Sequence, residues 1–387
     1  MYTRLLKKPF QNEKSFFLFG PRGVGKTTWV RSFLTQPLYF DLLETRLYTK
    51  LLRDPQLLEA LIPVNFTDWI VIDEVQRIPI LLNEVHRLIE NKKYKFILTG
   101  SSARSLRKKG VNLLAGRALT YHLYPLTIQE LGKDYNLEKI LQFGALAAVL
   151  NEADPQKYLE SYVQTYLREE VLQEGLTRNI SDFARFLEVA SYSQGSQLNM
   201  SNIAREAEIH QKVVVSYFNI LEDLLLSFRL YPFTKKAKRR LVTHPKFYYF
   251  DVGVYRHLRR LGPFDRPEEV GGIALESLFL QELTAVNDYY ECGYQIYFWR
   301  SQSGLEVDFV LYGAKGLVAI EIKQSRKVNI YDLKNLRAFK EDYPMAKLYL
   351  LYGGEHKEYH DDVEVIPFLT ALQDLPQLLG YKDIKAY

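Results

Sequence analysis

A group of residues suited to binding a triphosphate lies in the stretch FFLFGPRGVGKTTWV, residues 16–30. The pattern G-x-x-x-x-G-K-[ST] runs from Gly20 to Thr27. Its glycines allow successive backbone N–H groups to point at one phosphate chain, Lys26 adds a positive charge, and Thr27 offers a hydroxyl to Mg²⁺. The pattern predicts a nucleoside triphosphate site, whose members are Gly20, Pro21, Arg22, Gly23, Val24, Gly25, Lys26, Thr27 and Thr28.

Two acidic residues, Asp73 and Glu74, end the apolar run at 68–76. A solid apolar run is typical of a parallel strand buried on both faces, and its carboxyl end faces the ligand crevice of such a sheet. We expect Asp73 to hold Mg²⁺ through water, and Glu74 to orient and deprotonate the attacking water. The pair indicates hydrolysis of the bound triphosphate.

A second buried run, KFILTGSSA at 95–103, ends in small polar residues. Thr99 or Ser101 can contact the γ-phosphate or the attacking water from this position. Either residue can equally cap a following helix, so both interpretations stand.

These motifs, together with LLAGRALTYHLYPLTIQEL at 113–131, resemble one branch of prokaryotic AAA-type ATPases that carry a C-terminal domain of originally unknown function. The resemblance spans essentially the whole chain. It implies ATP and Mg²⁺ as cofactors, Thr99 as a first sensor, and Arg117 as an arginine finger acting in cis or from a neighbouring subunit. A simple surface arginine is the alternative for Arg117. The chain departs from the family at 144–149, where GALAAV replaces an expected Gly-Gly-x-Pro-Glu.

Alternating strand and helix signals place these residues on a parallel-sheet α/β domain over about 1–130. Strands are expected at 38–42, 68–76 and 95–103, with helical stretches near 44–60 and 79–91. A helical connector follows over 131–177. Its aromatic and aliphatic residues at 155–177 have helical spacing.

Residues 178–262 read as three helical segments followed by two apolar strands, at 227–233 and 241–252. Three helices and a hairpin are the elements of a winged helix-turn-helix. The hairpin tip, KKAKRR, is strongly basic, and Lys212 begins the expected recognition helix. We predict phosphate contact with DNA through Lys212, Lys235, Lys236, Lys238, Arg239 and Arg240. The alternative is a winged helix that docks protein and exposes a solvated basic loop.

The last domain, 263–387, contains a hairpin at 305–323 around the turn GAKG. A two- or four-residue loop pairs Asp308 with Glu321, and Glu306 with Lys323, with all four side chains on one face. Two facing carboxylates repel each other unless a cation bridges them.

This hairpin resembles the PD-(D/E)xK nuclease superfamily, a restriction-endonuclease-like α/β fold. The resemblance implies Asp308, Glu321 and Glu276 as Mg²⁺ ligands, with Lys323 positioning the attacking water for phosphodiester hydrolysis. Val307 stands where the superfamily has proline. A degenerate fold that binds nucleic acid or protein without cutting is the alternative.

Composition limits the class of protein. The chain has 387 residues, of which 47% are hydrophobic and 25% charged, so packed cores and two or three domains are expected. Its net charge of +5 is compatible with an anionic partner without requiring one. The single cysteine, Cys292, excludes an internal disulfide and favours the cytoplasm. No apolar run is long enough for a membrane span, and no signal peptide is recognisable.

The sequence therefore predicts a Mg²⁺-dependent AAA-type ATPase that acts on DNA. It also predicts a nuclease-like domain, for which both cleavage and binding without cleavage remain as interpretations. The alternative is a nucleotide-gated switch or scaffold, in which ATP controls assembly with a second copy or another protein.

Overall fold

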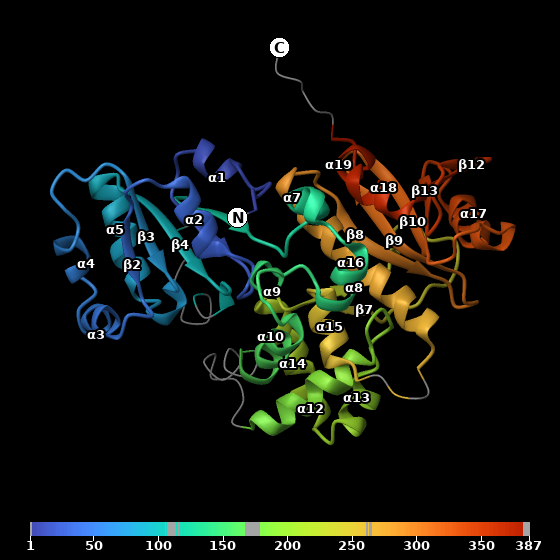
Figure 1. Cartoon of the computed structure of the whole chain (residues 1–387), viewed down its shortest axis with the longest axis horizontal. Helices are drawn as coiled ribbons and strands as arrows, with labels where there is room; N and C mark the ends of the chain where they lie inside the picture. Colours follow the sequence, from blue (N-terminus) through green and yellow to red (C-terminus); the bar gives the residue numbers. More distant parts are fainter. Residues whose placement is uncertain are drawn as a thin grey trace, which may run out of the picture. The chain divides into compact units, whose positions relative to one another are not determined.

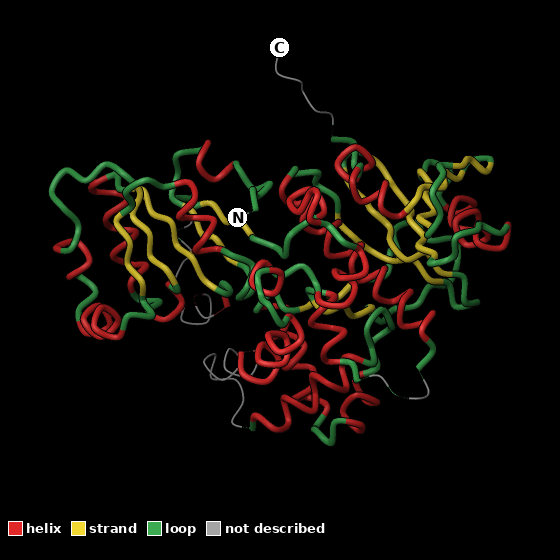
Figure 2. The backbone as a smooth tube through the Cα atoms, in the orientation of Figure 1, coloured by secondary structure: helices red, strands yellow, loops and turns green. Residues whose placement is uncertain are grey.

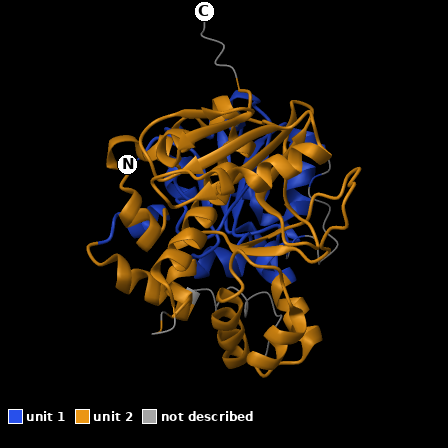
Figure 3. Ribbon diagram, turned by 90° about the vertical axis from the view of Figure 1, so that its right-hand side faces the viewer, with its two compact units in different colours: residues 1–126, 146–152, 219–226 blue, residues 127–145, 153–218, 227–387 orange. Residues whose placement is uncertain are grey.

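The structure is a computed structural model that describes residues 2–104, 106, 114, 116–166, 179–260, 262 and 265–381. The chain forms two compact units, coloured separately in Figure 3. Unit 1 contains residues 1–126, 146–152 and 219–226, and unit 2 contains residues 127–145, 153–218 and 227–387. Within the described residues, no helix has the length and apolar character needed to cross a membrane.

Unit 1 is built on a five-stranded sheet in the order β2-β3-β4-β1-β5, in which every neighbouring pair is parallel. Its strands are β1 (Phe16–Phe19), β2 (Leu38–Asp41), β3 (Trp69–Asp73), β4 (Lys95–Gly100) and β5 (Leu119–His122). Strands β1 and β3 are buried throughout, because helices cover both faces of the sheet. The predicted parallel-sheet domain is confirmed.

The helices of unit 1 are α1 (Lys8–Gln11), α2 (Lys26–Phe33), α3 (Thr45–Arg53), α4 (Leu57–Ala60), the 3₁₀ turn η1 (Val75–Arg77), α5 (Leu81–Lys92) and α9 (Ala147–Leu150). One face of the sheet packs on α3, α4 and α5 in a single apolar core (Figure 1). On the other face, rings from α1, α2 and the strands are in contact, as in the pair Phe10 and Trp29 with centroids 5.2 Å apart. Aromatic residues here serve packing.

Unit 2 begins with helical elements. They are α7 (Ile128–Leu131), η2 (Gly132–Asp134), α8 (Leu137–Phe143), α10 (Pro155–Ser161), the π-helical η3 (Tyr162–Tyr166), α12 (Ile180–Ser191), α13 (Met200–Glu206), the unit 2 part of α14 (Gln211–Asp223) and α15 (Val252–Leu258). Residues 155–166 are helical, as predicted for the connector. The rest of that prediction, residues 167–177, lies outside the described residues.

A six-stranded mixed sheet forms the C-terminal part of unit 2, in the order β12-β13-β11-β10-β9-β8 (Figure 2). Its strands are β8 (Gln295–Arg300), β9 (Glu306–Gly313), β10 (Gly316–Lys323), β11 (Lys347–Tyr352), β12 (Glu358–His360) and β13 (Val363–Pro367). The accompanying helices are α16 (Pro267–Tyr289), η4 (Ile330–Leu333), α17 (Lys334–Asp342), α18 (Phe368–Gln373) and α19 (Leu375–Leu378). Helix α17 shares an apolar core with β8–β11 and β13, and Phe279 of α16 packs on Phe309 of β9.

Two short strands, β6 (Ser227–Leu230) and β7 (Lys246–Tyr249), pair antiparallel within the predicted hairpin. Both are shorter than the expected strands at 227–233 and 241–252. The connection between them instead runs beside β8. Phe233 N donates to Phe298 O at 2.7 Å, and Val242 N donates to Arg300 O at 3.1 Å. Backbone groups that would pair with each other in a longer hairpin thus form hydrogen bonds with the edge strand β8.

Candidate functional site

The predicted triphosphate loop lines a cavity of about 340 Å³ in unit 1. Gly23 and Gly25 have φ of 82° and 92°, which a side chain would make unfavourable. A Cβ at Gly20 would lie 2.3 Å from Leu123 O. The loop therefore needs its glycines for both conformation and space.

Lys26 begins α2 directly after this loop and is buried. Its Nζ donates to Gly20 O at 2.6 Å and to Pro21 O at 3.1 Å. The ammonium therefore lies against the backbone of the loop, and Lys26 lines the cavity together with Thr27 and Glu74. The structure brings these three predicted residues together.

Asp73, at the end of β3, accepts hydrogen bonds from three hydroxyl groups. Thr27 Oγ1 donates to its Oδ2 at 3.0 Å, Tyr39 OH donates to the same oxygen, and Thr99 Oγ1 donates to Oδ1. Burial and the hydrogen bond to Asp73 both raise the pKa of Tyr39. Hydroxyl and carboxylate oxygens are the ligands that Mg²⁺ prefers, so Thr27 and Asp73 fit the magnesium site that the sequence predicts.

Thr99 belongs to β4 itself, and its hydroxyl is engaged by Asp73. Among the described residues, its oxygen also accepts from Glu74 N at 3.4 Å. Ser102 Oγ accepts from Arg104 N at 3.2 Å. A sensor role for Thr99 stays a prediction, and its hydroxyl would have to leave Asp73 or act through it.

Glu74 lies on the sharp turn after β3, with φ 59° and ψ 43°. Gln76 Nε2 donates to Glu74 Oε2, and lies 3.3 Å from Ser101 Oγ. Gly100 leaves room for this amide, because a Cβ there would lie 2.4 Å from Gln76 Oε1. Sequence reasoning missed Gln76, which lies in η1 just after β3, and Tyr39, which lies within β2.

Arg117 forms an ion pair with Glu90 of α5 through its Nε. Its side chain is 40% exposed. This contact neither supports nor opposes a finger that acts across subunits, and the role stays a prediction.

The departure from the family at 144–149 includes the start of α9, which borders the same cavity through Ala147 and Ala148. Ala148 N donates to Gly23 O at 3.0 Å. This segment thus packs against the phosphate loop and stabilises it, although it lacks the expected Pro-Glu pair.

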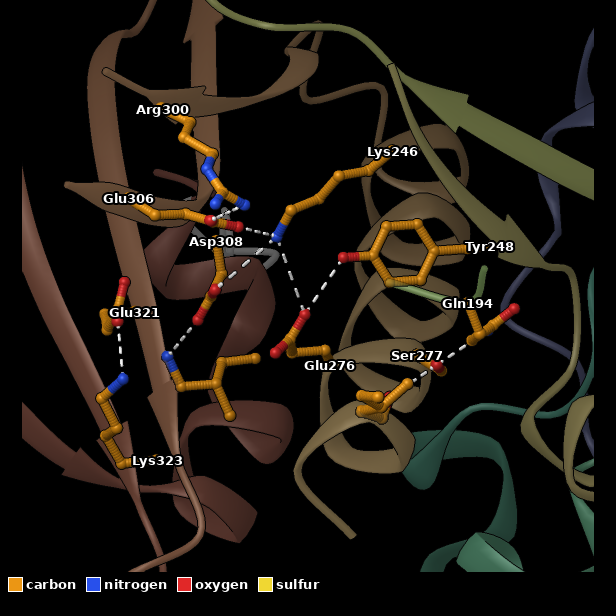
Figure 4. Close-up of polar contacts among 12 residues, drawn as sticks. Gln194, Lys246, Tyr248, Glu276, Ser277, Arg300, Glu306, Asp308, Glu321 and Lys323 are labelled. Carbon is orange, nitrogen blue, oxygen red and sulfur yellow. Dashed lines mark hydrogen bonds and ion pairs between the residues drawn. The ribbon is translucent and has the colours of Figure 1, made fainter. Parts of the chain in front are cut away.

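A second group of charged residues lies at the open end of the β9–β10 hairpin in unit 2 (Figure 4). The strands pair through Ile320 and Phe309 around a two-residue loop, in the register predicted from the sequence. This register sets Asp308 opposite Glu321. Asp308 Oδ2 accepts from Ile322 N at 2.8 Å, and Lys323 Nζ donates to Glu321 Oε1 at 2.7 Å.

Lys246 of β7 also enters this group, which the sequence did not indicate (Figure 4). Its buried Nζ forms an ion pair with Glu306 Oε1 and lies 4.0 Å from both Glu276 Oε2 and Asp308 Oδ1. Arg300 Nη1 contacts the other oxygen of Glu306 at 2.9 Å. We call Lys246, Glu276, Glu306, Asp308 and Glu321 the acid cluster.

Electrostatics in the acid cluster follow from burial. Desolvation, followed by the nearby Asp308 charge, raises the pKa of both Glu276 and Glu321 to about 8. Desolvation lowers the pKa of Lys246, but the surrounding acids outweigh it, so the pKa lies well above its ordinary value. The lysine is therefore a permanent cation at neutral pH.

The six predicted DNA-contacting residues do not share one environment. Lys238 Nζ donates to Glu341 O at 3.0 Å, Arg239 pairs with Glu341 and Asp342, and Lys235 Nζ lies 4.0 Å from the centroid of the Tyr312 ring. Lys236, Arg240 and Lys212 are exposed. Three of the six residues thus make contacts with other residues of unit 2.

Comparisons with known proteins match three consecutive segments of the chain. Residues 12–132 match a family model described as an AAA domain, while 134–265 and 271–371 match two models described as domains of unknown function, DUF8612 and DUF4143. The first and last matches support an AAA-type ATPase family.

The similar proteins do not add an activity. An uncharacterized protein of Mycobacterium bovis is 26% identical over 374 residues, covering 94% of this chain and 82% of the relative. Another, from Methanocaldococcus jannaschii, is 23% identical over 395 residues, covering 91% and 86%. A Vibrio cholerae crystal structure covers 89% of this chain and 97% of its own at 10% identity, but its TM-score of 0.23 carries no argument.

Proposed function

We propose that the chain binds ATP with Mg²⁺ and hydrolyses it at the phosphate loop of unit 1. One observation carries this proposal: Lys26, Thr27 and Glu74 line a single cavity, although Glu74 comes from a different strand. The match of this region to an AAA domain supports the same conclusion.

Each residue has a role that its contacts permit. The loop amides and Lys26 bind the phosphates, and Thr27 with Asp73 would hold Mg²⁺, which when bound neutralises phosphate charge. Glu74 orients and deprotonates the attacking water. Gln76 fixes the carboxylate of Glu74 through the hydrogen bond to Oε2.

The first prediction tests this assignment with Lys26→Ala. We expect phosphate release from ATP to fall to background, because the variant loses the charge that binds the β- and γ-phosphates. Lys14→Ala, which removes an exposed lysine of the same unit, should retain wild-type turnover. Undiminished phosphate release by Lys26→Ala would refute the assignment.

For the C-terminal half we propose a nucleotide-gated switch or scaffold. The acid cluster supports this choice, because the ammonium of Lys246 already lies within 4.0 Å of three of its four carboxylates. Gating of assembly would involve a second copy or a protein partner, with Arg117 available as a finger between subunits.

Metal-dependent cleavage of DNA is the second candidate function. The register that sets Asp308 opposite Glu321 favours it. DNA contact would then depend on the exposed Lys212, Lys236 and Arg240, since Lys238 and Arg239 are paired inside unit 2. Linear DNA incubated with Mg²⁺ and either the wild type or Asp308→Ala tests the candidate, and equal products from both eliminate this site.

A further inference from the structure

The acid cluster does not fit the metal ion that a nuclease-like hairpin implies. Among the described residues, no three His, Cys, Asp or Glu side chains are arranged to hold a metal. The space between Glu276 and Asp308 instead receives an ammonium group (Figure 4). We propose that Lys246 is the resident cation of this cluster and takes the place of a divalent metal ion.

Geometry gives the first support. Carboxylates from α16 and β9 converge on Lys246 Nζ, which lies 4.0 Å from both Glu276 and Asp308 and pairs with Glu306. An ion bound by the oxygens of Glu276 and Asp308 would lie beside this positive charge. Like charges in a buried site repel strongly, so metal and ammonium compete for the same position.

The backbone of Lys246 gives the second support. It pairs with Leu230 in β6 and forms a bridge with Gln197, so a strand rather than a loose loop delivers the side chain. The side chain is 3% exposed. For the ammonium to leave the acid cluster, β7 would have to move, or the Lys246 side chain would have to adopt another buried position.

The neighbouring groups are also paired internally. Tyr248 OH donates to Glu276 Oε2 at 3.1 Å, and Lys323 Nζ is occupied by Glu321 Oε1. Glu321 Oε2 is buried and, within the described residues, has no hydrogen-bond partner. Each of the four acids nevertheless has at least one partner from the chain itself.

The inference is independent of ATP hydrolysis, and it explains how the buried Asp308 and Glu321 coexist with the partly buried Glu276 and Glu306 in unit 2. Burying carboxylates without a counter-charge is costly. Lys246 provides a covalently attached cation beside Glu276, Glu306 and Asp308, while Lys323 pairs with Glu321. A cluster filled by Lys246 then lacks the metal needed for phosphodiester hydrolysis of the kind that the hairpin suggests.

The second prediction is that removing Lys246 creates a metal site. We would titrate the nucleotide-free full chain with Mn²⁺ and follow free Mn²⁺ by electron paramagnetic resonance. Lys246→Met should gain one Mn²⁺ per chain relative to the wild type, and the further change Asp308→Asn should abolish that gain. Lys235→Met, which alters an exposed lysine, should bind no additional Mn²⁺.

Two results would overturn the proposal. One is a wild-type protein that binds a Mn²⁺ which Asp308→Asn loses. The other is a folded Lys246→Met that gains no Mn²⁺. If Lys246→Met fails to fold, Mn²⁺ binding by the wild type is compared with binding by Asp308→Asn. Equal binding supports Lys246 as the resident cation. Weaker binding by Asp308→Asn refutes the proposal.

Discussion

At the scale of single residues, the orientation of Glu74 is the feature on which turnover depends. Its backbone has positive φ, and its carboxylate accepts a hydrogen bond from the amide of Gln76. A hydrogen bond from a neutral amide fixes the direction of a carboxylate and leaves it able to accept a proton. Gln76 is therefore a positioning residue for the proposed general base.

The third prediction concerns Gln76→Ala. We expect kcat for ATP hydrolysis to fall roughly 10-fold, a fraction of the ~10²–10⁴ that a general base contributes. KM should stay unchanged, because Gln76 is not among the residues that line the nucleotide cavity. Steady-state phosphate release measures both constants. A rise in KM with constant kcat would instead place Gln76 in nucleotide binding.

Residue types predicted the phosphate loop and the two acids because these depend on local sequence alone. Tyr39 and Lys246 could not be found in this way. Tyr39 reaches Asp73 because β2 and β3 are neighbours, and Lys246 reaches Asp308 because β7 packs beside β9. Both contacts are set by the fold, and the surrounding stretches LYFDL and KFYYF show only strand patterning.

At the scale of elements, the two hairpins illustrate what local sequence can determine. The β9–β10 register was predictable, because a two-residue loop fixes the pairing and the side-chain period is two. The β6–β7 connection was not, because its residues 231–242 pair with the edge of β8, about sixty residues further along the chain. The basic loop is consequently attached to the C-terminal sheet.

The fourth prediction tests that attachment with Arg239→Ala. Arg239 Nε lies 3.1 Å from Asp342 Oδ1, and the Asp342 side chain is only 4% exposed. Removing the guanidinium leaves a buried carboxylate without its partner. The free energy of unfolding should therefore fall by about 1–3 kcal/mol, as measured in urea.

Lys236→Ala is the matched control for that experiment. Lys236 is exposed and lies in the same loop, so its loss should change the free energy of unfolding by less than about 0.5 kcal/mol. Equal stability of both variants would mean that the loop is not fastened through Arg239.

At the scale of the whole molecule, the chain passes between its two units more than once. Residues 146–152 and 219–226 belong to unit 1, although the segments around them belong to unit 2. The predicted boundaries at 130, 177 and 262 followed local composition. Composition does not reveal that a later segment of the chain packs in an earlier unit. Leu225, for example, packs on the apolar core of unit 1.

The fifth prediction follows from the separate cores and from the location of the nucleotide cavity in unit 1. Calorimetry should resolve two unfolding transitions, and ATP with Mg²⁺ should raise only the transition of unit 1. At about 100 times Kd the gain is about 2.7 kcal/mol, because ligand binds only the folded unit. We would use Glu74→Gln to keep ATP intact during the scan. Adding Lys26→Ala should remove the shift. A single transition that ATP shifts as a whole would show that the units unfold as one.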